Sequence, residues 1–252
     1  MYAAAYGAQT SIGRPFHAKN ASKSSIISFR ERSYIANGAV LSATGIEDHG
    51  AFVKTIQEGF SELSAGSPSD DSAKTTSTYL GGESRINTSS HGYAHIAMGF
   101  KGIEGNTPLR NIVKHCLTTM SPSNVTAFAS PGITGLYTAA LTADASTATD
   151  ALTSAFLTPL TKDIIAKAKT AAKSEAIFAM NDSSKALAQA MTDSVLETGT
   201  FSTQGVIDSY DNIEDDVVMN AVSSMIGCNL SLAAVGEVGT VPYHATIAAR
   251  FS

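Results

Sequence analysis

Two neighbouring segments, residues 93–101 and 107–120, have different hydrophobic spacings. Residues 93–101 alternate, as in a strand with one buried face. The side expected to face the core is Ala94, Ile96, Met98 and Phe100, and the opposite side is Tyr93, His95, Ala97 and Gly99. Residues 107–120 follow a helical spacing, with Thr107 as the expected N-cap and Pro108 in the first helical position. The apolar positions of this helix are Leu109, Ile112, Val113, Cys116, Leu117 and Met120. A strand followed by a one-sided helix predicts a sheet with a helix packed on it.

The rest of the chain extends this pattern. Asp48 is the expected cap of a helix that carries Phe52, Ile56, Phe60 and Leu63, and residues 64–77 are expected to form a polar loop. Further strands are expected at 40–44, 81–86 and 230–235, with an extended stretch at 127–141 bent at Pro131-Gly132. Further helices are expected at 147–157, 163–180, 183–197, 203–210 and 214–226. Strands early and helices late predict an α+β fold, with helices layered on one face of a mostly antiparallel sheet.

Composition narrows the functional classes. The chain of 252 residues is 43% hydrophobic and carries a net charge of -5, which gives no electrostatic support for nucleic-acid binding. No apolar run approaches the roughly 20 residues of a membrane-spanning helix, so we expect membrane association only through a partner. Two cysteines, Cys116 and Cys228, cannot form a disulfide framework and favour a reducing compartment.

The first 30 residues contain no acidic residue. Their positive charges are Arg14, Lys19, Lys23 and Arg30, set among serines and alanines. This composition is typical of a mitochondrial transit segment. The alternative is that the stretch belongs to the folded domain.

The pair His91 and His95 is the sharpest candidate metal motif. Histidines four residues apart can bind zinc from one face of a helix, as in HxxEH sites. Here Gly92 and Ala94 stand where such motifs carry glutamate, and the segment continues into an alternating strand. Residues i and i+4 of a strand lie roughly 13 Å apart. We therefore expect no metal site, with His91 at a strand end and His95 partly buried.

Other chemistry has no sequence support. No serine lies in a G-x-S-x-G turn, and glycine-rich phosphate loops are absent. The acidic run Glu214-Asp215-Asp216 begins a predicted helix, where carboxylates complement the helix dipole. A set of lysines is expected to form a solvated helix face: Lys162, Lys167, Lys169 and Lys173. We therefore expect no catalytic, cofactor-binding or metal-binding residue, and no cofactor.

Several segments together resemble the second half of the pitrilysin-like metallopeptidases, the superfamily of the mitochondrial processing peptidases and the complex III core proteins. The segments that carry the resemblance are Tyr2–Tyr6, Phe29–Tyr34, Ala39–Gly45 with Asp48-His49, Gly81–Arg85 leading to His95–Ala97, Ala166–Lys169 with Asn181–Ser184, Tyr210–Val217 and Ala234–Gly239. At the Gly81–Arg85 hairpin, core protein 2 is the nearest likeness. The resemblance implies an inter-domain or N-terminal extension at residues 1–35 and a single non-catalytic, peptidase-like C-terminal domain at 36–252.

Departures from the superfamily shape the functional expectation. The zinc motif belongs to a first domain that this sequence lacks, and Ser121–Asn124 replaces the glycine-rich loop of the presequence-recognising peptidase subunit. The resemblance thus implies a catalytically inactive scaffold subunit of ubiquinol–cytochrome c reductase, on the matrix side of the mitochondrial inner membrane. Its expected partners are other core and membrane subunits, with no nucleic acid and no transmembrane segment of its own. Two alternatives stay open: the substrate-binding half of a processing peptidase whose zinc-bearing half is another chain, or a subunit of another mitochondrial assembly.

Overall fold

The computed structural model describes residues 1–14, 21–66 and 77–251. The chain divides into two compact units that interleave along the sequence. Unit 1 comprises residues 1–14, 77–176 and 204–252, and unit 2 comprises residues 15–76 and 177–203. This division differs from the expected boundary at residue 35, because the first 14 residues group with the sheet. Lys19 and most of the expected loop at 64–77 lie outside the described residues.

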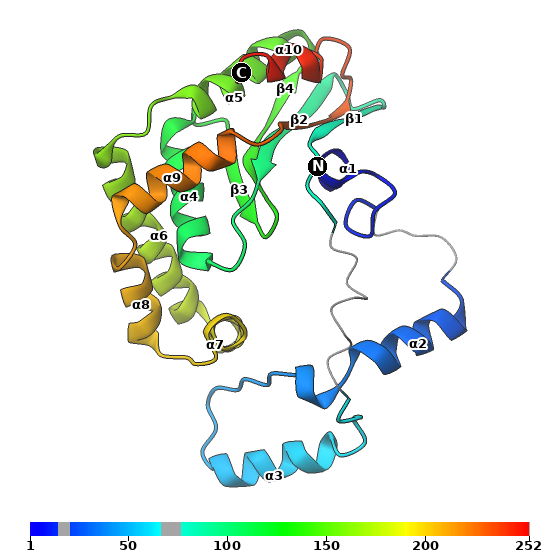
Figure 1. The fold of residues 1–252 in the computed structure, drawn as a ribbon, viewed down its shortest axis with the longest axis vertical. Helices are drawn as coiled ribbons and strands as arrows, with labels where there is room; N and C mark the ends of the chain where they lie inside the picture. Colours follow the sequence, from blue (N-terminus) through cyan, green and yellow to red (C-terminus); the bar gives the residue numbers. More distant parts are fainter. Residues whose placement is uncertain (15–20, 67–76, 252) are drawn as a thin grey trace. The chain divides into compact units, whose positions relative to one another are not determined.

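Unit 1 is built on a five-stranded sheet in the order β1-β5-β2-β4-β3. Its strands are β1 (Gly82–Asn87), β2 (Tyr93–Lys101), β3 (Thr126–Ser130), β4 (Ile133–Leu141) and β5 (Ser231–Gly236). Strands β1 and β5 are parallel, and every other neighbouring pair is antiparallel. The expected bend at Pro131-Gly132 is the turn of the β3–β4 hairpin, where Gly132 has a φ of 85°. The predicted α+β architecture is confirmed (Figure 1).

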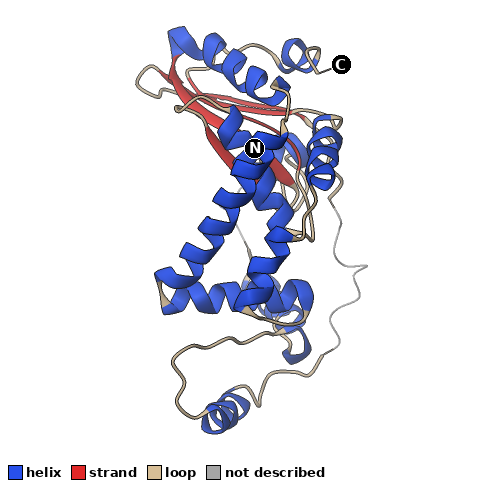
Figure 2. Ribbon diagram, turned by 90° about the vertical axis from the view of Figure 1, so that its left-hand side faces the viewer, coloured by secondary structure: helices blue, strands red, loops and turns tan. Residues whose placement is uncertain are grey.

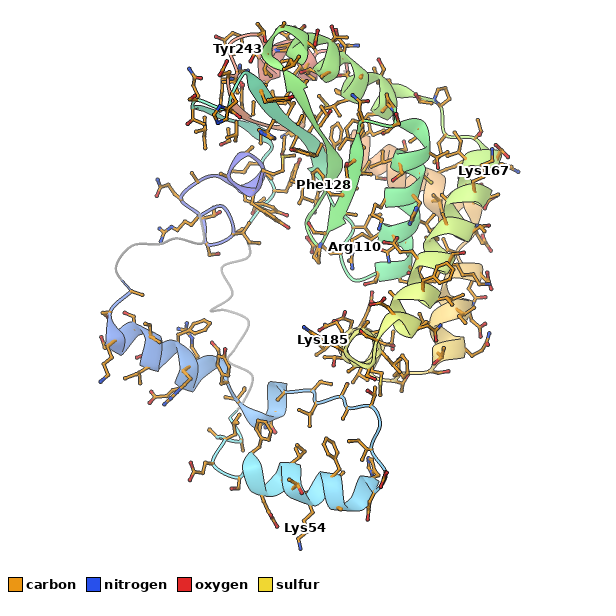
Figure 3. The ribbon with its side chains drawn as sticks, turned by 180° about the vertical axis from the view of Figure 1, so that it is seen from behind. Lys54, Arg110, Phe128, Lys167, Lys185 and Tyr243 are labelled. Carbon is orange, nitrogen blue, oxygen red and sulfur yellow. The ribbon has the colours of Figure 1, made fainter. Side chains whose placement is uncertain are left out.

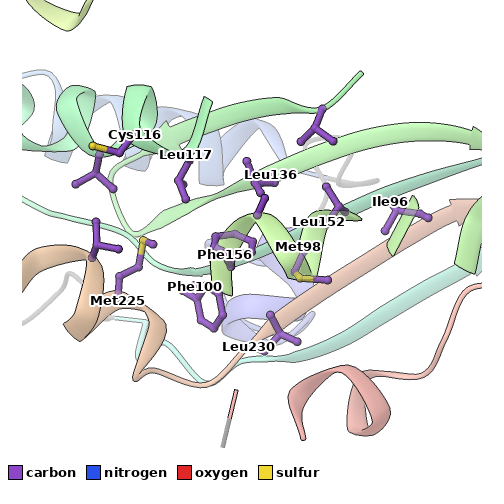
Figure 4. Packing of buried hydrophobic residues seen from close by; sticks show 14 of the residues in the cluster. Ile96, Met98, Phe100, Cys116, Leu117, Leu136, Leu152, Phe156, Met225 and Leu230 are labelled. Atoms are coloured by element: carbon purple, nitrogen blue, oxygen red, sulfur yellow. The ribbon is translucent and has the colours of Figure 1, made fainter. Parts of the chain in front are cut away.

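Helices of unit 1 pack on one face of this sheet (Figure 2). They are α4 (Thr107–Met120), α5 (Ala145–Leu157) after the short η3 (Thr142–Asp144), α6 (Lys162–Asp182), α8 (Thr203–Asp211), α9 (Asp215–Ile226) and α10 (His244–Ala248). Sequence reasoning missed α10. Within the core, Phe100 of β2 meets Phe156 of α5 edge-on at 5.1 Å between ring centroids, and Phe251 at 5.2 Å. Figure 4 shows Leu117 and Leu136 packed into the same cluster.

Helix α4 confirms most of its prediction. Its apolar stripe is buried as expected at Leu109, Ile112, Val113, Cys116 and Leu117, whereas Met120 is only partly buried. The expected N-cap was wrong by one residue: the side chain of Asn106 accepts from the Leu109 backbone N–H at 2.9 Å. Thr107 therefore occupies the first turn, where its hydroxyl accepts from Arg110 at 2.7 Å. An Asn side chain reaches that N–H well, which explains the shift.

Unit 2 contains α2 (Lys23–Ser33), η1 (Ala36–Gly38), α3 (His49–Gly59) and α7 (Ser184–Thr198), with the end of α6. Asp48 caps α3 as predicted, accepting from the Ala51 N–H at 2.9 Å. The helix ends before Phe60 and Leu63, which were expected to extend its apolar face. The strand expected at 40–44 is absent from this described segment, and Leu41 is 52% exposed. A strand needs a paired neighbour to be stable, and unit 2 supplies none among its described residues.

The expected solvated lysine face on α6 was only partly right. Lys167 projects outward (Figure 3) and pairs with Asp163 of its own helix at 2.7 Å. Lys173 instead faces α8, with its Nζ 2.6 Å from Asp211. Lys169 faces α9, with its Nζ 2.5 Å from Asp215. These two lysines therefore link helices, which spacing within a single helix could not indicate.

Candidate interaction surface

The sheet face opposite the helix layer is only partly covered. Helix α1 (Tyr2–Tyr6) packs over one half of it, and the Ala5 carbonyl accepts from the Leu80 N–H at 2.7 Å and the Gly81 N–H at 3.1 Å. Next to Met1, the N-cap residue of this helix, Gly99 of β2 is paired with Gly135 of β4. A Cβ on Gly99 would lie 3.0 Å from the Met1 methyl carbon and 2.7 Å from the Thr134 carbonyl oxygen. Glycine there lets α1 and the neighbouring strand approach closely.

Tyrosines hold this covered half together. Tyr6 donates to the Gly132 carbonyl at 2.7 Å, and its ring meets Tyr79 edge-on at 5.6 Å. The Tyr79 hydroxyl lies 2.7 Å from the Ser231 hydroxyl and donates to the Asn229 carbonyl at 2.9 Å. Burial raises the pKa of Tyr79 to about 12, so this phenol stays protonated and acts as a hydrogen-bonding group.

The other half of this face is open and apolar. Its rows follow from the strand register: His95 lies between Ala139 and Val235, and Ala97 lies between Tyr137 and Ala233. The exposed apolar side chains here are Ile86 (55%), Tyr93 (45%), Tyr137 (36%), Leu141 (50%) and Val235 (38%). A contiguous apolar surface of this kind on a sheet is typical of a protein-binding site. These residues define the open sheet face.

His95 belongs to this surface, so its predicted partial burial was wrong. Its side chain is exposed and its ring stacks on Tyr137, with centroids 6.2 Å apart and planes 13° from parallel. The His95 Nδ1 lies 2.7 Å from the Tyr137 hydroxyl. The alternation of β2 places His95 with Tyr93 and away from the helices, which accounts for its exposure.

His91 lies apart from His95, in the turn before β2. It has a φ of 51°, and Gly92 after it donates its N–H to Glu237 at 2.9 Å. Glu237 also accepts from the Thr142 hydroxyl at 3.4 Å, so the carboxylate fastens this turn to η3. Among residues 1–14, 21–66 and 77–251, no three His, Cys, Asp or Glu side chains gather as a potential metal-binding group.

The remaining sequence candidates have local structural roles. Asp215 and Asp216 lie in the first turn of α9 after Glu214 at its N-cap position, as expected. Burial raises the pKa of the Cys116 thiol to about 12, so this cysteine lacks the thiolate of a nucleophile. The Cys228 thiol donates to the Ser224 carbonyl at 3.3 Å.

Arg85 makes a set of long-range contacts that the sequence analysis did not predict. From β1 it donates Nη1 to the carbonyls of Val238 and Val241, both at 2.9 Å, and Nη2 to Pro242 at 3.0 Å. Its Nε bonds to Glu83 at 2.8 Å, and its guanidinium lies 4.8 Å from the ring centroid of Tyr243. Figure 3 labels Tyr243 at this end of unit 1. The guanidinium thus clamps the segment after β5 against the first strand, and the Gly81–Arg85 motif was the available signal.

Comparison with known proteins gives a structural likeness only. No protein-family model and no curated protein matches the sequence. Among solved structures, the chain is similar to a chain of complex III2 from Candida albicans with Inz-5 bound. The TM-score is 0.82 at 13% sequence identity, and the match covers 99% of this chain and 68% of that chain. At that identity the likeness establishes the fold, which this chain shares with a complex III chain.

Proposed function

We propose that the chain is a non-catalytic core subunit of mitochondrial ubiquinol–cytochrome c reductase, bound on the matrix side of the inner membrane. The observation that carries this proposal is the fold likeness to a complex III chain over 99% of the sequence. The segments that resemble the processing peptidases and core proteins support it independently, because they were identified from sequence alone. In the described residues, no helix is long and apolar enough to span a membrane.

The open sheet face supplies the contact surface in this proposal. A scaffold subunit requires broad apolar surface at its interfaces, and this face carries three exposed aliphatic and two tyrosine side chains on rigid strands. Aromatic anchors such as Tyr93 and Tyr137 are the residue types that dominate binding energy at interfaces. Its partners are other core and membrane subunits of the complex.

A paired substitution tests both membership and surface. Val235→Glu puts a charge in the centre of the open sheet face, where Val235 is 38% exposed. Val217→Glu is the matched control, since Val217 on α9 is 43% exposed on the helix side. In native gels of mitochondrial membranes, the wild-type chain and Val217→Glu should migrate with complex III, and Val235→Glu should lose most of that share.

Each alternative result has a definite meaning. A wild-type chain found only as a free 26.1 kDa species would overturn the assignment to complex III. If both variants enter complex III equally, the open sheet face is not the contact surface, but the assignment to complex III stands. The rival reading, half of a processing peptidase, predicts co-purification with a chain containing HxxEH and peptidase activity in that complex.

A further inference from the structure

The two edge strands of the sheet, β1 and β3, differ in how well they are protected against pairing with a further strand. At the β1 edge, the hydrogen bonds of Gly82 and Thr88 to β5 leave the backbone of Glu83, Arg85 and Asn87 directed outward. Charged side chains at a strand edge discourage pairing with another strand. Glu83 and Arg85 are also tied to the segment after β5, through the His244 N–H and the Val238 carbonyl. This edge is therefore closed to strand addition.

The β3 edge has none of these protections. Its sequence, Thr-Ala-Phe-Ala-Ser at 126–130, has no charge and no proline, and its register with β4 continues without a bulge. Every residue of β3 keeps accessible surface. Uncharged, regular edge strands of this kind readily pair with another strand.

The backbone groups that point outward follow from the hydrogen-bond alternation. Gly92 accepts from Thr142 on the β4 side, so even-numbered residues of β2 bond to β4. In β4, the odd-numbered residues are therefore left to bond to β3, and Gly135 bonds to Phe128. The N–H and C=O groups of Ala127 and Ala129 consequently face away from the sheet. Across the described part of the chain, no residue outside the β3–β4 ladder is hydrogen-bonded to them.

The side chains of β3 itself leave this edge uncovered. The Phe128 ring lies over Gly135, where an added Cβ would be only 2.7 Å from the Phe128 Cζ, so the ring is directed inward. The alanine side chains of β3 lie on the helix side, where Ala127 packs against the core cluster. Outward from β3 there are thus backbone groups flanked by small residues.

We propose that β3 pairs antiparallel with β3 of a second copy of this chain. The five residues form a near-palindrome about Phe128: an alanine on each side, then a hydroxyl residue at each end. Antiparallel pairing centred on Phe128 places Ala127 opposite Ala129 of the partner subunit, and Thr126 opposite the partner's Ser130. The four outward groups of each copy then form four hydrogen bonds across a two-fold axis, the symmetry of an isologous dimer. This inference does not depend on the proposed function.

The short strand limits the strength of this dimer. Five residues on each side bury less than the roughly 1,000 Å² usual for a stable interface, so the dimer dissociates on dilution. Sedimentation of the full chain should show a monomer–dimer equilibrium. Ala127→Pro removes one outward N–H per copy without touching the β4 ladder, and should raise the dimer dissociation constant at least about tenfold. Asn87→Pro, at the outward edge of β1, should leave it unchanged.

Disulfide cross-linking between two copies tests the proposed register of the β3–β3 pairing. Paired positions that do not exchange hydrogen bonds bring Cα atoms to about 4.5 Å, within disulfide range. In a Cys228→Ser background, the double variant T126C/S130C should give a disulfide dimer under mild oxidation. Neither single variant should give a disulfide dimer. In the proposed register, residues 126 and 130 each lie opposite the other position in the partner subunit, so a single variant places a cysteine opposite a serine or a threonine. Circular dichroism checks that each variant folds.

Three results would overturn the proposal. The first is a chain that stays monomeric at every concentration, as expected if β3 instead accepts a strand from a different protein. The second is cross-linking of the single variants as efficiently as the double variant, since it would indicate collision rather than register. The third is dimerisation that Ala127→Pro leaves intact.

Discussion

Replacing Arg85 tests whether the clamp on the C-terminal segment stabilises unit 1. Arg85→Ala leaves three backbone carbonyls, those of Val238, Val241 and Pro242, without their charged donor. Hydrogen bonds to charged groups contribute about 1.5–3 kcal/mol each in favourable cases. The Arg85 side chain is 21% exposed, so water replaces part of each bond. We therefore expect a loss of about 3 kcal/mol in the free energy of unfolding.

The loss should be global because the clamped segment leads into the core. After the clamp come Ile247, which is 2% exposed, and Phe251, whose ring meets Phe100 and Phe156. Urea unfolding followed by circular dichroism measures the change. Limited proteolysis gives a second readout, since residues 238–244 should become cleavable in Arg85→Ala.

Two comparison variants distinguish the loss of the Arg85 hydrogen bonds from the loss of a positive charge alone. Arg85→Lys keeps the charge, but its single ammonium cannot reach all three carbonyls, so it should recover less than half of the loss. Arg250→Ala breaks an exposed pair with Asp150, where the two side chains are 40% and 58% exposed, and should cost no more than about 1 kcal/mol. The clamp would be refuted by Arg85→Ala unfolding within about 1 kcal/mol of wild type, or by full recovery in Arg85→Lys.

Three further predictions concern the core, acid stability and zinc. Leu117→Ala, at a fully buried position, should cost about 2–5 kcal/mol, whereas Leu157→Ala, 46% exposed on α5, should cost far less; equal losses would contradict the layer assignment. Burial raises the pKa of Glu175, but hydrogen bonds from Lys114 and His115 outweigh it and lower the pKa below the usual 4.5. The stability advantage of wild type over Glu175→Gln should therefore be present above about pH 4.5 and shrink on acidification, and a constant difference would disprove this account. Metal analysis of the purified chain should find no stoichiometric zinc, and zinc that is lost on His91→Ala would contradict the non-catalytic proposal.

The sequence pattern was sufficient to predict a helix or strand whose structure depends mainly on its own neighbouring residues. The stripe of α4 and the alternation of β2 each need only a few neighbouring residues, and both were predicted with the correct buried side. The same alternation already placed His95 with Tyr93, so its exposure followed from the sequence, and the expectation of partial burial ignored that parity. The strand at 40–44 failed for the opposite reason: Val40 and Leu41 favour an extended chain, but a strand also needs a partner.

Ion pairs and hydrogen bonds between distant segments could not be predicted from the sequence, because they depend on how those segments pack. Lys169 and Lys173 look solvated from spacing within α6, and only the placement of α8 and α9 brings carboxylates to them. Arg85 is similar, since its acceptors lie 153 to 157 residues away along the chain. The sequence indicated that Gly81–Arg85 mattered, but the reason is visible only in three dimensions.

The division of the outer sheet face into a covered and an open half depends on side-chain size within single strands. In β2, the side chains on this face run Tyr93, His95, Ala97 and Gly99, and size falls toward the end that α1 covers. Gly99 leaves room for the Met1 side chain, since an added Cβ there would lie 3.0 Å from the Met1 methyl carbon. Gly135 leaves room for the Phe128 ring, whose Cζ would lie 2.7 Å from an added Cβ. A side chain at Gly99 would crowd Met1, the N-cap residue of α1, and one at Gly135 would displace the Phe128 ring. The same strand therefore determines where the chain covers itself and where it leaves surface for a partner.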